Sequence, residues 1–266
     1  MKFYKEKLTA SINRKGVMDI DTVKGCTMGM KKYPDGGCYG LCYAYKIAKL
    51  YRYDFTKSVS RLISDKDIRQ LQLFNGLCLD SSKIVFNTVK RHKMSWFRIG
   101  VMGDPCHDWP LTVDLCEWLH GFRIPVIVTK HWIKIHDDLL PKLRMAKVVF
   151  NTSISPLDSD EEIKHRLQQF NRLKAAGIRS VLRIVSCKFG NTATGTSLNE
   201  IQKELFCNSP IIDNPLRIPK TDKRVINGDI LVKKHKDLGG GSTISIFNPK
   251  TYIGTCDKCP DQCGVI

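Results

Sequence analysis

The chain has 266 residues, a length that can bury one substantial hydrophobic core and fits a single α/β domain with an appendage. Lysine and arginine number 43 against 26 acidic residues, and the net charge of +17 favours an anionic partner such as nucleic acid, although a diffusely basic surface gives the same sum. No apolar run is long enough to span a bilayer, and residues 1–7 lack the apolar centre of a signal peptide. Eleven cysteines stand in metal-like spacings rather than in a disulfide framework, so we expect a cytoplasmic protein with reduced thiols.

The first predicted elements are a strand and a cysteine-rich loop. Residues 17–24 alternate apolar and polar side chains, which predicts a strand. Residues 24–45 hold Cys26, Cys38 and Cys42 among several glycines, and we expect an irregular loop there because glycine and proline break helices and strands alike. Three thiolates are one fewer than a structural zinc site or a complete cubane cluster usually takes, so one coordination position is left open. The alternatives are a zinc loop with a fourth ligand from elsewhere, or simple reduced thiols.

Helices and strands alternate along the rest of the chain. We expect helical or mixed segments over residues 44–53, 65–78 and 81–92. Further strands are predicted over residues 97–102, 125–129, 146–154, 180–186 and 210–218. Helices are predicted between them, over residues 111–119, 135–143, 160–176 and 198–206. About six βα units of this kind indicate a parallel sheet with crossover helices.

The run Cys38-Tyr39-Gly40-Leu41-Cys42-Tyr43-Ala44 resembles the cluster loop of the radical SAM superfamily, and most of all the branch around spore photoproduct lyase. The spacing of the three cysteines is wider here than is usual in that superfamily. The resemblance implies a partial (β/α)6 TIM-type barrel over residues 1–219 and a small cysteine-containing C-terminal extension over residues 220–266. It also implies that Cys26, Cys38 and Cys42 each hold one iron of a 4Fe–4S cluster, whose fourth iron binds S-adenosylmethionine.

The same resemblance continues at the predicted strand ends. Gly103-Asp104-Pro105 is similar to a family element whose acidic residue accepts a hydrogen bond from the amino group of S-adenosylmethionine. Leu41 takes the place of an apolar residue that approaches adenine. Further cofactor-binding candidates follow in the family's order: Thr129, Lys130, Ser153, Ser155 and Arg183. Taken singly, each of these is equally explained as a strand-end cap, and an Asp-Pro turn is common.

The remaining cysteines fall outside that ordered series. Cys106 follows Pro105, and our hypothesis gives it a catalytic role as hydrogen-atom donor to a substrate radical, with a packed free thiol as the alternative. Cys256, Cys259 and Cys263, two and then three residues apart, predict a second metal site that holds either iron–sulfur or zinc. The other four are interpreted as core or incidental thiols: Cys78, Cys116, Cys187 and Cys207.

The resemblance implies an enzyme of lyase or transferase type. It would reductively cleave S-adenosylmethionine to a 5′-deoxyadenosyl radical that abstracts hydrogen from a substrate, with an electron donor such as flavodoxin or ferredoxin. The net charge makes a nucleic-acid base the first substrate we expect, for repair or modification. One alternative is a radical SAM enzyme acting on a peptide or small molecule. Another is a non-catalytic, metal-stabilised nucleic-acid-binding protein.

Overall fold

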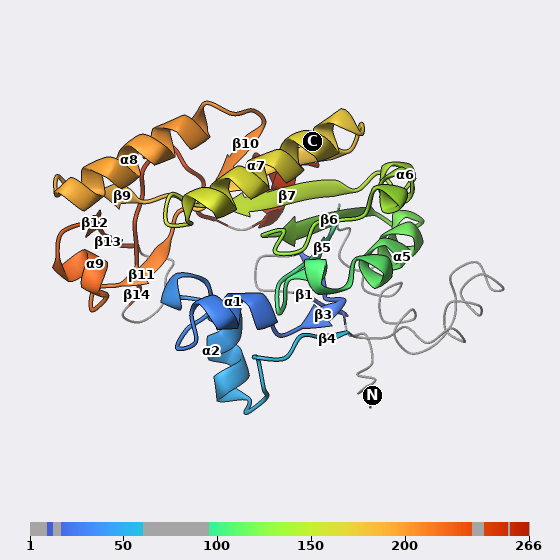
Figure 1. The fold of residues 1–266 in the computed structure, drawn as a ribbon, viewed down its shortest axis with the longest axis horizontal. Coiled ribbons are helices and arrows are strands. Elements are labelled where there is room, and N and C mark those ends of the chain that lie inside the picture. Colours follow the sequence, from blue (N-terminus) through green and yellow to red (C-terminus); the bar gives the residue numbers. More distant parts are fainter. Residues whose placement is uncertain (1–9, 13–16, 61–95, 236–241, 255, 266) are drawn as a thin grey trace.

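The structure is a computed structural model, and it describes residues 10–12, 17–60, 96–235, 242–254 and 256–265 (Figure 1). The segments predicted at 65–78 and 81–92, and Cys78 with them, lie outside the described residues. Within the described residues, no helix is both long enough and apolar enough to cross a bilayer.

Six parallel strands form the centre of the molecule. Their spatial order follows the chain: β2 (Met18–Ile20), β5 (Trp96–Ile99), β6 (Ile124–Thr129), β7 (Val149–Ile154), β8 (Arg179–Ile184) and β10 (Ile211–Asp213). At one edge, β1 (Ala10–Ile12) pairs antiparallel with β2. Parallel neighbours in chain order require crossover connections, and the arrangement confirms the predicted fold class, a partial TIM-type barrel.

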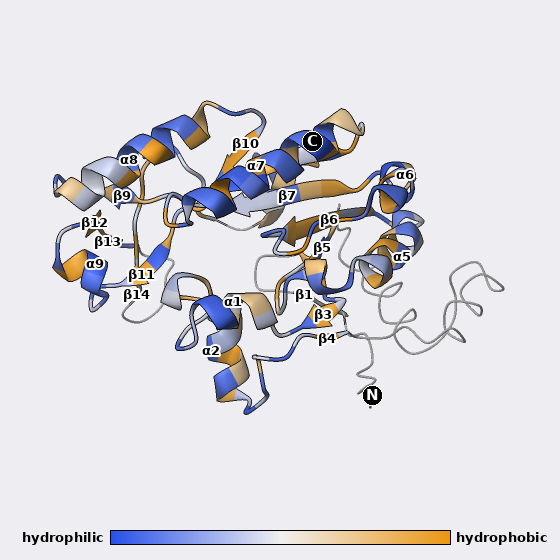
Figure 2. Ribbon diagram, viewed as in Figure 1, coloured by the Kyte–Doolittle hydropathy of each residue, from blue (hydrophilic) through white to orange (hydrophobic). Residues whose placement is uncertain are grey.

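Helices form the crossovers between these strands. They are α5 (Trp109–His120), α6 (Leu140–Met145), α7 (Asp160–Ala175) and α8 (Ala193–Phe206). Helix α7 starts at a capping box in which Ser159 and Glu162 bond each other's backbone N–H groups, and its first turn is acidic. Figure 2 shows β5 and β6 as largely hydrophobic and these helices as mixed, which is the pattern of amphipathic helices covering a buried sheet.

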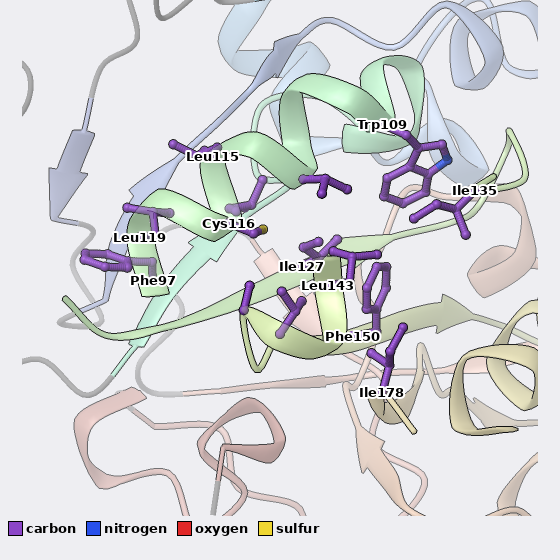
Figure 3. Close-up of a cluster of buried hydrophobic side chains, with 14 of the residues drawn as sticks. Phe97, Trp109, Leu115, Cys116, Leu119, Ile127, Ile135, Leu143, Phe150 and Ile178 are labelled. Atoms are coloured by element: carbon purple, nitrogen blue, oxygen red, sulfur yellow. The ribbon is translucent and has the colours of Figure 1, made fainter. Parts of the chain in front are cut away.

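The largest apolar core lies between the sheet and helices α5 and α6 (Figure 3). Phe97, Ile127 and Phe150 come from the strands and are fully buried. Leu119 and Leu143 come from the helices and are equally buried. Burial of this kind supplies most of the stabilisation of such a layer, at roughly 25 cal/mol per Å² of apolar surface removed from water.

The opposite, concave face of the sheet changes character along the strands. At the amino ends it is apolar, with Val126, Val149 and Val181 in one cluster. Closer to the carboxyl ends, alternate residues on the same face are polar. Arg98 forms an ion pair with Asp19 at 2.9 Å, and other polar residues of this face include Asn151, Ser153 and Arg183. A polar inner face at the carboxyl ends is where a barrel of this type binds its ligands.

Short elements surround the barrel. Near the first strand they are β3 (Val23–Lys24), α1 (Thr27–Lys32), α2 (Tyr43–Leu50) and β4 (Val59–Ser60), and β3 pairs with β4. Later in the chain they are β9 (Lys188–Phe189), β11 (Arg217–Pro219), α9 (Lys223–Ile226), β12 (Ile230–Leu231), β13 (Lys233–Lys234) and β14 (Ser242–Ile244). Strand β11 pairs with β14, and β12 pairs with β9, so residues on both sides of position 220 share these small sheets.

Two predicted strands are interrupted in the structure. Residues 17–24 divide into β2 and β3 because the Asp21 carboxylate turns to accept N–H groups from the loop after β5. Residues 210–218 divide into β10 and β11 at Pro215, which has no N–H to donate to a sheet. After that proline, Leu216 N bonds Ser186 O at 2.9 Å, two residues beyond the bond from Asn214 N to Ile184 O, so pairing with the segment after β8 resumes in the same register.

Candidate functional site

The cysteine loop contains a helix that the sequence did not predict. Helix α1 starts directly after Cys26, whose Sγ accepts a hydrogen bond from Gly29 N at 3.4 Å and so caps the helix. The expectation of an irregular loop throughout residues 24–45 is therefore wrong for this segment. Gly29 was interpreted as a breaker, but it lies inside the helix, at a position where the close Cys26 Sγ would crowd a larger residue.

Three thiols gather around this helix. A Cβ added at Gly29 would lie 2.9 Å from Cys26 Sγ and 3.8 Å from Cys38 Sγ, so both sulfurs border the same small space. A Cβ at Gly37 would lie 3.5 Å from Cys42 Sγ. Among the described residues, no three His, Cys, Asp or Glu side chains come close enough to hold a single metal ion. A 4Fe–4S cluster gives each thiolate its own iron and therefore accepts a wider arrangement, and cysteine thiolates are the donors that such clusters use.

The surroundings of Cys26 and Cys38 favour the protonated form of these two thiols. Burial raises the pKa of Cys26, and the charges of Asp104, Cys38 and Cys42 raise it further. Burial also raises the pKa of Cys38 to about 11, against the opposing effect of the Lys130 ammonium. Because metals bind the thiolate, loading iron here would release protons.

Asp104 lies beside the cysteines at the end of β5. Its Oδ1 accepts hydrogen bonds from Cys106 N at 3.0 Å and from the Thr129 hydroxyl at 2.6 Å, and its Oδ2 accepts one from Lys130 N at 2.8 Å. A carboxylate offers about four acceptor sites, so Asp104 keeps capacity for a further donor. Gly103 allows this position, because a Cβ there would lie 2.4 Å from a backbone oxygen of β3.

A buried ion-pair network joins the cysteine loop to the next strands. Tyr39, in the loop, donates from its hydroxyl to Asp158 Oδ1 at 2.8 Å, and Lys130 Nζ bonds both Tyr39 and Asp158. Arg166 of α7 pairs with the other oxygen of Asp158 and is 1% exposed. Burial raises the pKa of Asp158, but Lys130 and Arg166 more than offset this and hold it below the usual value. We call these four residues the Asp158 network.

The extension after residue 219 also contacts the cysteine loop. Arg224 of α9 donates to Tyr39 O at 2.9 Å while its guanidinium pairs with Asp222. Tyr39 has φ of 58°, a conformation that most residues avoid, and bonds at both its hydroxyl and its carbonyl hold it there.

The other predicted cofactor residues differ in burial and in the hydrogen bonds that they already make. Ser153 and Arg183 are register partners on β7 and β8, half-buried on the concave face, and Arg183 donates to Asn214 Oδ1 at 3.0 Å. Ser155 is fully buried, and its hydroxyl donates to Val185 O at 2.8 Å, as a strand-end cap does. Leu41 is half-buried against the cluster that contains Tyr39. Their contact with a cofactor stays a prediction.

Cys106 lies in the core under α5 and is 1% exposed. Burial raises the pKa of its thiol, and the charge of Asp104 adds to the effect. The packed-thiol alternative accounts for this position without any catalytic role. Hydrogen-atom donation from Cys106 stays a hypothesis.

The three C-terminal cysteines lie at the other end of the sheet. Cys263 is 8% exposed and packs against valines of the concave face, and Asn151 Nδ2 donates to Cys263 O at 2.9 Å. Cys256 packs against the same cluster, and Cys259 is half-buried. The second metal site predicted here is not confirmed, since no three such ligands converge among the described residues.

Sequence reasoning missed the residues that hold the site together. Asp21 accepts bonds from Gly100 N, Val101 N and Met102 N at 2.7–2.9 Å, which fixes the loop leading to Asp104. The alternation of residues 17–24 gave no signal for this role, because Asp21 stands at one of its polar positions. Arg166 did have a signal, since it stands three residues after Ile163 on the apolar face of the predicted helix.

Two solved structures are similar to this chain. One is a Tyr-to-Phe variant of spore photoproduct lyase, with a TM-score of 0.55 and 16% identity over 90% of this chain and 72% of the lyase chain. The other is a Cys-to-Ala variant of the same lyase with dinucleoside spore photoproduct, with a TM-score of 0.52 and 16% identity over 89% and 70% of the two chains. No protein-family model and no curated protein matches the chain. At this identity the likeness shows a shared fold.

Proposed function

We propose that the chain is a radical SAM enzyme that binds a 4Fe–4S cluster at Cys26, Cys38 and Cys42. The observation that carries this proposal is the gathering of these thiols beside Asp104, at the carboxyl ends of parallel strands in a fold shared with a lyase. In barrels of this kind, ligands and chemistry belong to that end. A closed structural site would be expected to use a fourth protein ligand.

The bound cofactors would supply one-electron reductive cleavage of S-adenosylmethionine and hydrogen abstraction from a substrate. The protein would supply orientation and the exclusion of water. Asp104 would accept a hydrogen bond from the amino group of S-adenosylmethionine through the capacity left on Oδ2. Arg183 and Ser153 would bind its carboxylate or ribose hydroxyls from the concave face, since a guanidinium donates and a hydroxyl does both.

The Asp158 network would hold Tyr39 and therefore the backbone between Cys38 and Cys42. Because its charges are buried and paired, they have little freedom to reorganise when the site is filled. Lys130 was expected to bind the cofactor, and in our proposal it acts instead by fixing the loop, since its ammonium is already bonded to Tyr39 and Asp158.

For the substrate we propose a nucleic-acid base. Two observations favour it: the net charge of +17, and the dinucleoside photoproduct named with one of the similar structures. A base in a duplex would have to leave the stack to reach the mouth of a barrel. A small electron-transfer protein such as a flavodoxin or ferredoxin would complete the system.

The test is anaerobic reconstitution of the wild type beside Cys38→Ala. We expect the wild type to be brown, to hold about four irons and matching sulfide per chain, and to convert S-adenosylmethionine to 5′-deoxyadenosine with dithionite. Cys38→Ala should lose the colour and the product together. A colourless, zinc-containing wild type without product would contradict the proposal and favour the non-catalytic binding protein.

A further inference from the structure

Helix α2 presents a basic and aromatic face to solvent. The helix starts after Cys42 and buries Ala44 and Ala48, which are 3% and 0% exposed. It runs downward from beneath α1 in Figure 1, so that its far end lies away from the parallel sheet. Exposed residues on its other side, with two that follow the helix, form what we call the α2 patch: Tyr43, Lys46, Lys49, Leu50, Tyr51 and Arg52.

Large apolar and aromatic side chains are exposed to solvent in this patch. Leu50 and Tyr51 are adjacent and are 73% and 72% exposed, and Tyr43 is 51% exposed. The Tyr43 hydroxyl bonds Val101 O at 3.0 Å, so the patch starts at the loop that leads to Asp104. Single exposed apolar residues are ordinary, but adjacent ones that continue from a candidate active site suggest a contact surface.

The charges of the patch all have one sign. Lys46, Lys49 and Arg52 lie within residues 43–53, a stretch that contains no acidic residue. Lysines three positions apart on a helix repel each other, so this pair does not stabilise α2. An anion bound alongside the helix would remove that repulsion.

At the C-terminal end of α2, an arginine occupies a position where glycine is usual. Arg52 N bonds Lys49 O at 3.3 Å and Tyr53 N bonds Ala48 O at 3.1 Å, which together make a Schellman motif. The residue in the left-handed position of this motif is Arg52, with φ of 56°. Residues other than glycine rarely adopt this backbone conformation. Arg52 is therefore strained, and its side chain adds a positive charge to the patch.

Both ends of the patch are tied to the cysteine loop. Cys42 is the residue before α2, and after the helix Phe55 O accepts a hydrogen bond from Cys26 N at 3.0 Å. Tyr53 is fixed by Lys24 Nζ, which lies 4.1 Å from the centre of its ring. Eight helical residues span about 12 Å, a length that covers roughly three nucleotides at 3.4 Å each.

We propose that the α2 patch binds a nucleic-acid strand next to the mouth of the barrel. Lys46, Lys49 and Arg52 contact phosphates, and Tyr51, with Leu50 beside it, stacks on an unpaired base. The inference rests on the proposed function to the extent that the bound strand carries the substrate of the site. The patch would hold the strand while one of its bases enters the barrel.

Equilibrium binding of fluorescein-labelled oligonucleotides, single-stranded and duplex, tests this at several salt concentrations. Lys46→Gln/Lys49→Gln should weaken binding roughly 10- to 100-fold near 0.1 M salt and lower the slope of log K against log salt by about two. Tyr51→Ala should weaken binding about 5- to 150-fold and leave that slope unchanged, because stacking releases no counterions.

A charge-matched control is Lys233→Gln/Lys234→Gln on β13, where both lysines are exposed. We expect this variant to lose much less affinity than the α2 variant. An equal loss in both would indicate a diffuse basic field and overturn the proposal, as would unchanged binding in the α2 variants. Binding of the α2 patch to vesicles of anionic phospholipid, without oligonucleotide binding, would also overturn it in favour of a membrane surface.

The two proposals can fail separately. The α2 variants should keep the dithionite-driven formation of 5′-deoxyadenosine, because none of the substituted residues is placed at the site itself. A wild type that makes this product but binds no oligonucleotide contradicts the α2 proposal alone. A wild type that binds oligonucleotide through α2 but makes no product contradicts the proposed function alone.

Discussion

Two sets of three cysteines occupy opposite ends of the same sheet. The upper set, Cys26, Cys38 and Cys42, lies at the carboxyl ends of the strands beside glycines that leave room next to the sulfurs. The lower set, Cys256, Cys259 and Cys263, lies at the amino ends, where Cys263 is enclosed by valines. The upper cysteines have eleven and then three residues between them, and the lower ones have two and then three. Their surroundings also differ in charge and hydrogen bonding.

The comparison shows how much the surroundings of two sets of three cysteines in one chain can differ. Around the upper set, the Asp158 network and Asp104 fix the loop by buried ion pairs and hydrogen bonds. Around the lower set, Gly264 lets the backbone approach β8, since a Cβ there would lie 2.4 Å from Val181 Cγ2.

The largest difference should appear in iron content. Cys42→Ala should reduce iron from about four per chain to near zero, whereas Cys259→Ala should leave it unchanged. Iron and sulfide analysis after anaerobic reconstitution measures both. About eight irons in the wild type, halved by Cys259→Ala, would show that the lower set also binds a cluster.

Asp158→Asn should give the largest loss of stability. The substitution leaves Lys130 and Arg166 buried without their counter-charge, so the free energy of unfolding should fall by about 3 kcal/mol. Urea denaturation of the iron-free protein measures it. The control is Asp160→Asn, an exposed site two residues away, which should change little. Equal stabilities of the two variants would show that the network does not bear on the fold.

Gly29→Ala should separate metal binding from folding. The new Cβ would crowd Cys26 Sγ, so we expect iron content to fall several-fold while the fold is kept, since alanine favours a helix over glycine by about 1 kcal/mol. Gly121→Ala at the end of α5 is the matched control, because the nearest atom there would lie 3.5 Å away. Full iron content in Gly29→Ala would contradict the cluster position.

Asn151→Ala should have the smallest effect of these and act on stability alone. It removes the hydrogen bond from Asn151 Nδ2 to Cys263 O, which is worth about 1 kcal/mol. Iron content and formation of 5′-deoxyadenosine should match the wild type. A loss of iron in this variant would mean that the two ends of the sheet are coupled.

The fold class could be predicted from the sequence because it depends on local patterns. The same patterns predicted that the cysteine loop and Asp104 follow neighbouring strands. Alternating residues predicted the strands, and the capped amphipathic pattern predicted α7, whose bounds agree with residues 160–176 to within one residue. The cysteine loop and Asp104 come together because the ends of adjacent parallel strands meet at one edge.

Other parts could not be predicted, because they depend on partners distant in the chain. Helix α1 is capped by Cys26 Sγ, which accepts a hydrogen bond from Gly29 N, and local propensity does not reveal this cap. The Asp158 network joins residues from three loops and a helix. The second metal site at the lower cysteines stays a prediction, and their spacing says nothing of the valines against which Cys263 packs.

The seating of Cys263 and Gly264 on β7 and β8 has a consequence for synthesis. These strands leave the ribosome well before the residues that fill their concave face. A nascent chain stalled before residue 256 would therefore expose valines that the folded chain hides.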